Sequence, residues 1–111
     1  MLICLKLPAK ILTAAEATEV EKIEWLIAEI ESMDQVEFIR NGKEYSSKDA
    51  ARHMRLKWEE AGKLIRTVDD FVDICASRSW LSGKPYLIRY PDGSIIQSFI
   101  FFRRLLQEFS N

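Results

Sequence analysis

The chain has 111 residues, 48% hydrophobic and 30% charged, and its 16 basic and 17 acidic side chains give a formal net charge of −1. This length fits one domain. The composition excludes collagen, low-complexity disorder and a polycationic nucleic-acid tail. A fold of this size can bury enough surface to be stable without a disulfide or a metal.

Residues 1–12 form an apolar N-terminal segment that Lys6 interrupts. No basic region precedes the apolar stretch, so the segment as written does not make a competent signal peptide. Two interpretations stay open: an ordinary N-terminal arm, or the remnant of a signal segment that starts upstream. No run approaches the roughly 18 apolar residues of a membrane span. We therefore expect an arm, residues 1–12, and one domain, residues 13–111, that does not span a membrane.

The first helix is expected to begin at Thr13, an N-cap residue whose capping box Glu16 would complete. Helical spacing then gathers four apolar side chains on one face: Val20, Ile23, Ile27 and Ile30. Trp25 lies nearly opposite this stripe, so it either packs beneath another segment or contacts a partner.

Asn41-Gly42 separates two short β-prone runs, residues 36–40 and 43–45. Both residues tolerate a positive φ, so this pair predicts a hairpin. Ser46 and Ser47 offer the N-cap of a second helix that runs to about Lys63. Leu56 points away from the apolar stripe of that helix, which suggests that the helix is covered on two sides.

Thr67 and Asp70 form a capping box for a third helix that ends near Ala76. A serine-rich loop, residues 77–85, leads into an alternating strand, residues 86–90, and a turn at residues 91–93. Residues 95–109 predict a short strand or extended start and a final helix from about Gln97. The order α-β-β-α-α-β-α predicts a single small α+β domain, with about four helices packed on an antiparallel sheet of two to three strands.

Two cysteines and one histidine are the candidate metal ligands of the chain. Cys4 and Cys75 have no metal-ligand spacing, and Cys75 lies among apolar residues, which is typical of a buried thiol. One histidine cannot form a zinc site alone. We therefore predict no metal site and no cofactor.

His53 and Lys57 are one helical turn apart, and a histidine near neutral pH could act as a general base. No nucleophile motif accompanies it, so no catalytic residue is assigned. Ser82-Gly83-Lys84 is not a phosphate loop, because Pro85 removes an amide donor and a strand follows. The serines and Lys84 could still bind an anion. The candidate ligand-binding residues are His53, Lys57, Ser82, Lys84 and Tyr86.

Acidic residues dominate positions 14–37, and basic residues dominate positions 38–66. The second group suggests a candidate basic patch made of Arg40, Lys43, Lys48, Arg52 and Arg55. Such a patch gives salt-dependent phosphate affinity, but no aromatic side chains interleave with these bases, so nucleic-acid binding is not expected. A solvated face, or an intramolecular match to the acidic first helix, is preferred.

Three apolar side chains fall outside the predicted core stripes: Trp25, Leu56 and Phe101. Phe101 and Leu105 would leave an apolar strip on a second face of the last helix. Small domains rarely expose a large contiguous apolar surface. These three residues are therefore a candidate interface, either in a homo-oligomer or with another protein.

A family resemblance rests on five segments in a fixed order: residues 38–42 (Phe-Ile-Arg-Asn-Gly), 53–57 (His-Met-Arg-Leu-Lys), 65–67, Phe71, and 82–86 (Ser-Gly-Lys-Pro-Tyr). With these the chain resembles the YfeK-like family, small and mostly signal-peptide-bearing bacterial proteins of unknown function. The resemblance implies a bacterial source and an envelope location in the periplasm. A genuine start at Met1 would instead place the protein in the cytoplasm. The family brings no activity, cofactor or catalytic residue.

Many members of that family carry a cysteine just before the Phe-x-Arg-Asn-Gly segment and another after Lys-Pro-Tyr. Val36 and Tyr90 stand at those places here. If members bridge the two cysteines, strand 36–40 lies beside strand 86–90, and apolar packing has replaced the bridge in this chain.

These observations favour a non-catalytic binding or protein-interaction module. The alternative is a small-ligand or anion-binding protein, or an enzyme, that uses a cleft around the five candidate ligand-binding residues.

Overall fold

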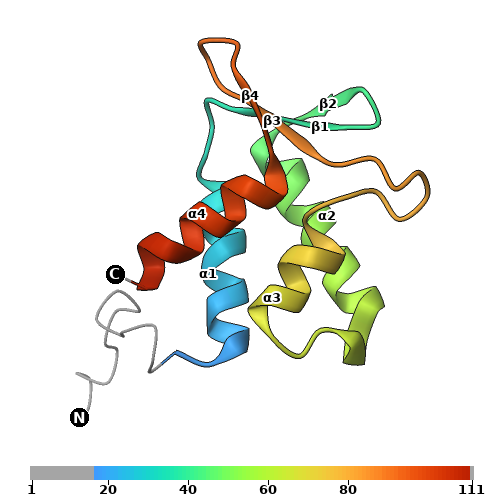
Figure 1. Cartoon of the computed structure of the whole chain (residues 1–111), viewed down its shortest axis with the longest axis vertical. Coiled ribbons are helices and arrows are strands. Elements are labelled where there is room, and N and C mark those ends of the chain that lie inside the picture. The colour runs from blue at the N-terminus through green and yellow to red at the C-terminus, as the bar shows by residue number, and fades with distance from the viewer. Residues whose placement is uncertain (1–16, 111) are drawn as a thin grey trace.

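The computed structural model describes residues 17–110, which form a small α+β domain, as the sequence predicts (Figure 1). The elements in chain order are α1 (Glu19–Glu31), β1 (Glu37–Arg40), β2 (Lys43–Tyr45), α2 (Ser47–Ala61), η3 (Gly62–Leu64), α3 (Val68–Asp70), η4 (Phe71–Cys75), β3 (Leu87–Arg89), β4 (Ile95–Gln97) and α4 (Ser98–Ser110). The predicted arm, residues 1–12, and Cys4 lie outside the described residues.

The four strands form one antiparallel sheet in the order β2-β1-β3-β4. The prediction of two to three strands is short by one, because Ile95–Gln97 pairs with β3 instead of only leading into the last helix. Glu37 pairs with Arg89 across β1 and β3, so these two strands are neighbours, the arrangement expected if family members bridge the two cysteines. Continuing that register by one residue places Val36 opposite Tyr90, and both pack against the core.

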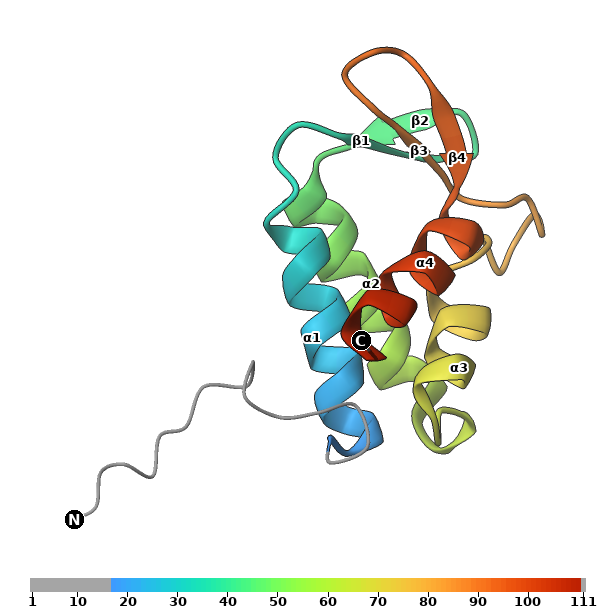
Figure 2. The same cartoon turned by 60° about the vertical axis from the view of Figure 1, so that its left-hand side comes forward.

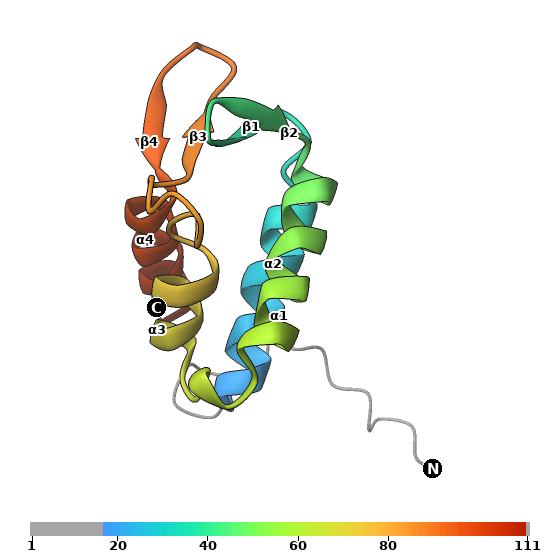
Figure 3. The ribbon, with the colours of Figure 1, turned by 90° about the vertical axis from the view of Figure 1, so that its right-hand side faces the viewer.

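The sheet lies across one end of the helices. Figure 2 shows the strands arching over them, and in Figure 3 α1 and α2 stand on one side while α3 and α4 stand on the other. The residues between these layers form one apolar core. Its fully buried members include Leu26, Ile30, Phe71, Val72, Ile88 and Phe102.

The start of α1 differs from the prediction. Ala17 and Thr18 are not helical, and Thr18 is the N-cap: its Oγ1 accepts from the Glu21 amide at 3.1 Å, and its amide donates to Glu21 Oε1 at 2.8 Å. The predicted capping pair, Thr13 and Glu16, lies outside the described residues. The later start leaves Val20 exposed in the first turn, where the prediction placed it on the buried stripe.

The other predicted helix starts are confirmed. Ser46 caps α2 by accepting from the Asp49 amide, and Thr67 forms the expected capping box with Asp70. The third helix continues from α3 as the π-helix η4, which buries Phe71 and Cys75 completely. Within residues 17–110, every helix is too short or too polar to cross a membrane.

Candidate functional site

A groove of about 350 Å³ lies between α2 and the β1–β2 hairpin. Asn41 and Gly42 have φ values of 53° and 79°, which turn the chain sharply enough for Ser46 to cap α2 directly after β2. The hairpin therefore lies against the first three turns of α2. The lining residues are Phe38, Ile39, Arg40, Tyr45, Asp49, Ala50, Arg52, His53, Met54, Leu56 and Tyr86.

Arg40 lies at the polar end of the groove. Its Nη1 donates to His53 Nε2 at 2.9 Å, and its Nη2 donates to Tyr45 Oη at 3.1 Å. A guanidinium has no acceptor, so His53 Nε2 carries no proton and the neutral ring holds its proton on Nδ1. Burial, followed by the charges of Arg40 and Lys57, lowers the pKa of His53 from its ordinary value, which favours this neutral form.

Lys57 lies behind the groove and is closed off from solvent, with 4% of its surface exposed. Its Nζ donates to Tyr86 Oη at 2.7 Å and to the Arg78 carbonyl at 2.9 Å. The same ammonium lies 4.8 Å from the centre of the Trp80 ring and 4.7 Å from that of Tyr86. Burial lowers the pKa of Lys57 to about 8.

Tyr86 connects Lys57 to the groove. Its hydroxyl accepts from Lys57 at 2.7 Å and lies 3.5 Å from His53 Nε2, the nitrogen that accepts from Arg40. Burial raises the pKa of Tyr86, so the phenol stays protonated. A continuous polar cluster therefore runs from Lys57 through Tyr86 and His53 to Arg40.

The two cations of this cluster have neutral partners. Within the described part of the chain, no carboxylate lies within 4.0 Å of the Arg40 guanidinium or the Lys57 ammonium. Asp49 also lines the groove, but its carboxylate pairs with Arg52 at 2.8 Å. The polar end of the groove therefore carries uncompensated positive charge.

The five predicted ligand-binding residues divide into three groups. His53 and Tyr86 line the groove, and Lys57 supports Tyr86 from behind. Ser82 and Lys84 do not line it: Ser82 Oγ donates to Asn41 Oδ1 at 2.6 Å and accepts from the Lys84 amide at 3.1 Å. These bonds fasten the 77–85 loop to the hairpin turn beside Arg40.

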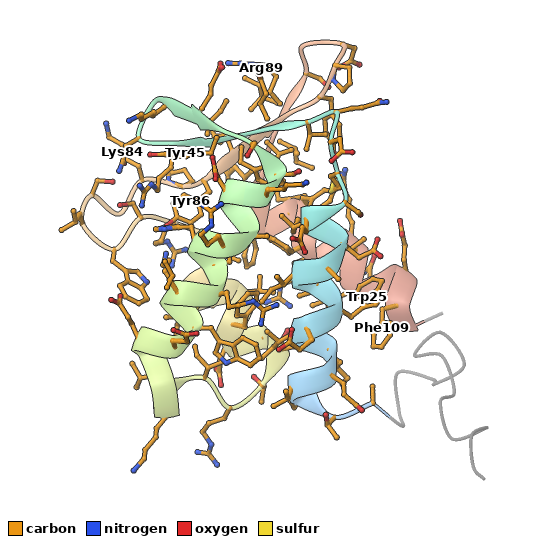
Figure 4. The ribbon with its side chains drawn as sticks, turned by 180° about the vertical axis from the view of Figure 1, so that it is seen from behind. Trp25, Tyr45, Lys84, Tyr86, Arg89 and Phe109 are labelled. Carbon is orange, nitrogen blue, oxygen red and sulfur yellow. The ribbon has the colours of Figure 1, made fainter. Side chains whose placement is uncertain are left out.

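The three candidate interface residues have different environments. Trp25 stacks on Phe109 with ring centres 4.7 Å apart, so it packs beneath α4. Phe101 contacts Phe102 edge to face at 5.7 Å and is partly buried against the core. Leu56 remains 52% exposed at the groove. In Figure 4 Trp25 and Phe109 lie together on one side of the view, and Tyr45, Tyr86 and Lys84 lie on the other.

The candidate basic patch is dispersed. Arg40 faces the groove, Arg52 pairs with Asp49, and Arg55 donates two hydrogen bonds to Glu24 of α1, at 3.0 and 2.8 Å. Lys43 and Lys48 are exposed. The Arg55–Glu24 pair is the intramolecular match to the acidic first helix that the charge pattern suggested.

Sequence reasoning missed Tyr45 and Trp80 as members of the site. Tyr45 directly precedes the N-cap of α2, so its position against that helix follows from the hairpin and could have been inferred. Trp80 depends on the loop conformation, because its Nε1 donates to the Ile74 carbonyl at 2.7 Å. Among residues 17–110, no group of three or more His, Cys, Asp or Glu side chains is placed to hold a metal ion.

The protein is thus a small α+β domain with a groove of about 350 Å³ beside α2. A family model described as a family of unknown function (DUF5329) matches residues 17–110, so the chain belongs to that family. It is 33% identical over 70 residues to the uncharacterized protein YfeK of Salmonella typhimurium, as the resemblance indicated. That match covers 63% of this chain and 58% of the relative, less than two thirds of its length. No solved structure matches the chain.

Proposed function

We propose that this protein is a non-catalytic binding module whose ligand site is the groove between α2 and the β1–β2 hairpin. The observation that carries the proposal is the composition of the groove. Apolar side chains, among them Phe38, Met54 and Leu56, line it beside three converging polar groups, from Arg40, Tyr45 and His53. Small-molecule sites combine an apolar lining with a few such polar groups.

Binding is favoured over catalysis because the nucleophilic groups near the groove are committed elsewhere. The Lys57 amine is enclosed by two rings and two hydrogen bonds. Cys75 is fully buried, and burial raises the pKa of its thiol to about 11, so it carries little thiolate at neutral pH. Ser77 donates to the Val72 carbonyl, and Ser82 is bonded to Asn41.

A small ligand is favoured over a protein partner at the predicted interface residues. Trp25 and Phe101 pack against other parts of the chain, and Leu56, the exposed member of the three, belongs to the groove. An apolar residue on the rim of a groove completes a site for a small molecule without needing a second protein.

The proposal is tested with two exposed leucines, Leu56 at 52% and Leu64 at 67% exposure, of which only Leu56 lines the groove. The full chain is labelled with ¹⁵N and titrated with 1-octanol, an uncharged apolar probe. We expect saturable amide shifts in residues 38–56 and at Tyr86. Leu56→Lys should weaken this binding several-fold, because it adds a charge to the apolar rim, and Leu64→Lys should not.

The absence of saturable shifts around the groove would overturn the proposal. Equal weakening by both substitutions would also overturn it, because the probe would then bind elsewhere or bind through a general surface effect. The dispersion of the amide spectrum reports in the same experiment whether each variant is folded.

For location, we propose that the protein works at the bacterial envelope. The support is its similarity to a family whose members mostly carry signal peptides. Expression of the natural gene with a C-terminal epitope tag, followed by osmotic-shock fractionation, tests this. Recovery with periplasmic markers is expected, and recovery with cytoplasmic markers would overturn it.

A further inference from the structure

We infer that the ligand of the groove is an amphipathic carboxylate, and that Arg40 binds its head group while the apolar lining holds its body. The inference rests on the proposed function and names the chemical class of the ligand. It follows from the unusual partners of Arg40, the surrounding charges and the lining of the groove.

The partners of Arg40 are all neutral. Its guanidinium donates to the imidazole of His53 and to the phenol of Tyr45, and the phenol of Tyr86 lines the same groove. A guanidinium has five N–H donors, more than these groups use, and its planar fork fits a carboxylate with two parallel hydrogen bonds. Arg40 lines the groove, so an incoming carboxylate can reach these donors.

The groups around Arg40 leave the positive charge uncompensated. The hairpin contributes Arg40 and Tyr45, α2 contributes Asp49, Arg52, His53 and Lys57, and the 77–86 segment contributes Tyr86. Asp49 is the one carboxylate of that set, and Arg52 already pairs with it. A half-buried cation beside neutral acceptors favours an anion, because the ligand then supplies the missing counter-charge.

Much of the remaining lining is hydrocarbon. Phe38 of β1 and Ala50, Met54 and Leu56 of α2 form this apolar surface. Ligand pockets range from about 300 to 1,000 Å³, so the groove suits a small molecule near the lower limit. A short alkyl or aryl body next to a carboxylate matches the apolar and the polar residues of the lining.

Three probes with the same alkyl chain separate the head group from the body: octanoate, 1-octanol and octylamine. Each is titrated into the full chain by isothermal calorimetry, below the concentration at which it forms micelles. Octanoate should bind about tenfold or more tighter than octanol, the gain expected from a charged hydrogen bond. Octylamine should bind most weakly, because it brings a second positive charge to Arg40.

Arg40→Gln is the direct variant, and Arg89→Gln is its matched control. Arg89 lies on the same sheet but pairs with Glu37 and Glu44 away from the groove. Arg40→Gln should abolish the preference for octanoate and leave octanol binding unchanged, whereas Arg89→Gln should preserve both. If Arg40→Gln does not fold, Arg40→Lys replaces it: the charge remains but the fork is lost, so the preference should fall without disappearing.

If octanol binds as tightly as octanoate to the natural chain, the inference is overturned while the proposed binding groove stands. The same holds if Arg40→Gln keeps the full preference for octanoate. If none of the three probes binds saturably, the proposed function itself fails.

Discussion

The two faces of the sheet differ in the partners of their arginines. On the outer face Arg89 pairs with Glu37 and Glu44, so its charge is neutralised inside the protein. On the helix-facing side Arg40 donates to an imidazole and to a phenol beside an open groove. An arginine is therefore neutralised by carboxylates on one face, whereas on the other face it keeps a positive charge that an anion can pair with. Its surroundings decide between these roles.

The pleat explains why the two arginines differ. Glu37 pairs with Arg89 and Ile39 pairs with Glu44, so all four side chains share the outer face. Arg40 and Phe38 are offset by one residue from them and face α2. A shift of one residue in the register would exchange the two environments.

The largest expected effect is on the free energy of unfolding, and it compares one isoleucine from each face of the sheet. Ile88 is fully buried on the helix-facing side, whereas Ile95 on the outer face is 51% exposed. Ile88→Ala should lower the free energy of unfolding by about 2–5 kcal/mol, because it leaves a cavity in the core. Ile95→Ala should change it by about 0.5 kcal/mol or less. Urea denaturation followed by circular dichroism measures both.

Similar losses for Ile88→Ala and Ile95→Ala would contradict this comparison. They would mean that the outer face is also covered in solution, for example by a second copy of the chain. Repeating the measurement at several protein concentrations identifies that case, because the stability of an associated form rises with concentration.

The second prediction compares two lysines. Lys57→Met should lower the free energy of unfolding by about 1–3 kcal/mol, because the Tyr86 hydroxyl and the Arg78 carbonyl lose their charged donor. Lys84, an exposed residue of the 77–85 loop, is the control. Lys84→Met should leave stability unchanged within error in the same urea experiment.

A gain in stability for Lys57→Met would contradict the structural role of the ammonium. Methionine packs well against aromatic rings, and replacing a buried charge by an apolar group is stabilising in some proteins. In that case Lys57 would belong to the binding function, and its loss should then weaken binding in the groove.

Much of the fold follows from local signals in the sequence. Asn41-Gly42 specified the hairpin because few other residues adopt two successive positive φ values. Thr67 and Asp70 specified a helix start for a similar local reason. The predicted start of α1 was wrong. The Thr-x-x-Glu spacing of a capping box occurs twice, at Thr13 and at Thr18, and the local pattern does not show which threonine caps the helix.

The site was harder to predict because its geometry depends on distant segments. His53, Lys57 and Tyr86 were recognised through their spacing and motif, and the structure brings them together. Arg40 was assigned to a surface patch, because nothing in the sequence shows that its strand faces α2. Ser82 was expected beside the ligand, but its hydroxyl is used to fix the loop to Asn41.

The smallest expected effect concerns the pH dependence of stability. His53 is the single histidine of the chain, and burial together with the Arg40 and Lys57 charges lowers its pKa in the folded state. The unfolded chain therefore takes up a proton more readily, so folding is weakened as the pH falls below the ordinary histidine value of about 6.5. Above that value both states hold a neutral ring, and this contribution is constant.

His53→Gln is the matched variant, because glutamine keeps an acceptor for Arg40 but does not titrate. Urea denaturation is carried out on both proteins at several values between about pH 7.5 and pH 5.5. The difference between them isolates the histidine, because carboxyl groups titrate mainly at lower pH and Lys57, whose pKa is about 8, is present in both. The natural chain should lose stability across this range, and the variant should lose less. Equal slopes would show that folding does not lower the pKa of His53. The distinction between the two faces of the sheet would then rest on the different partners of Arg40 and Arg89.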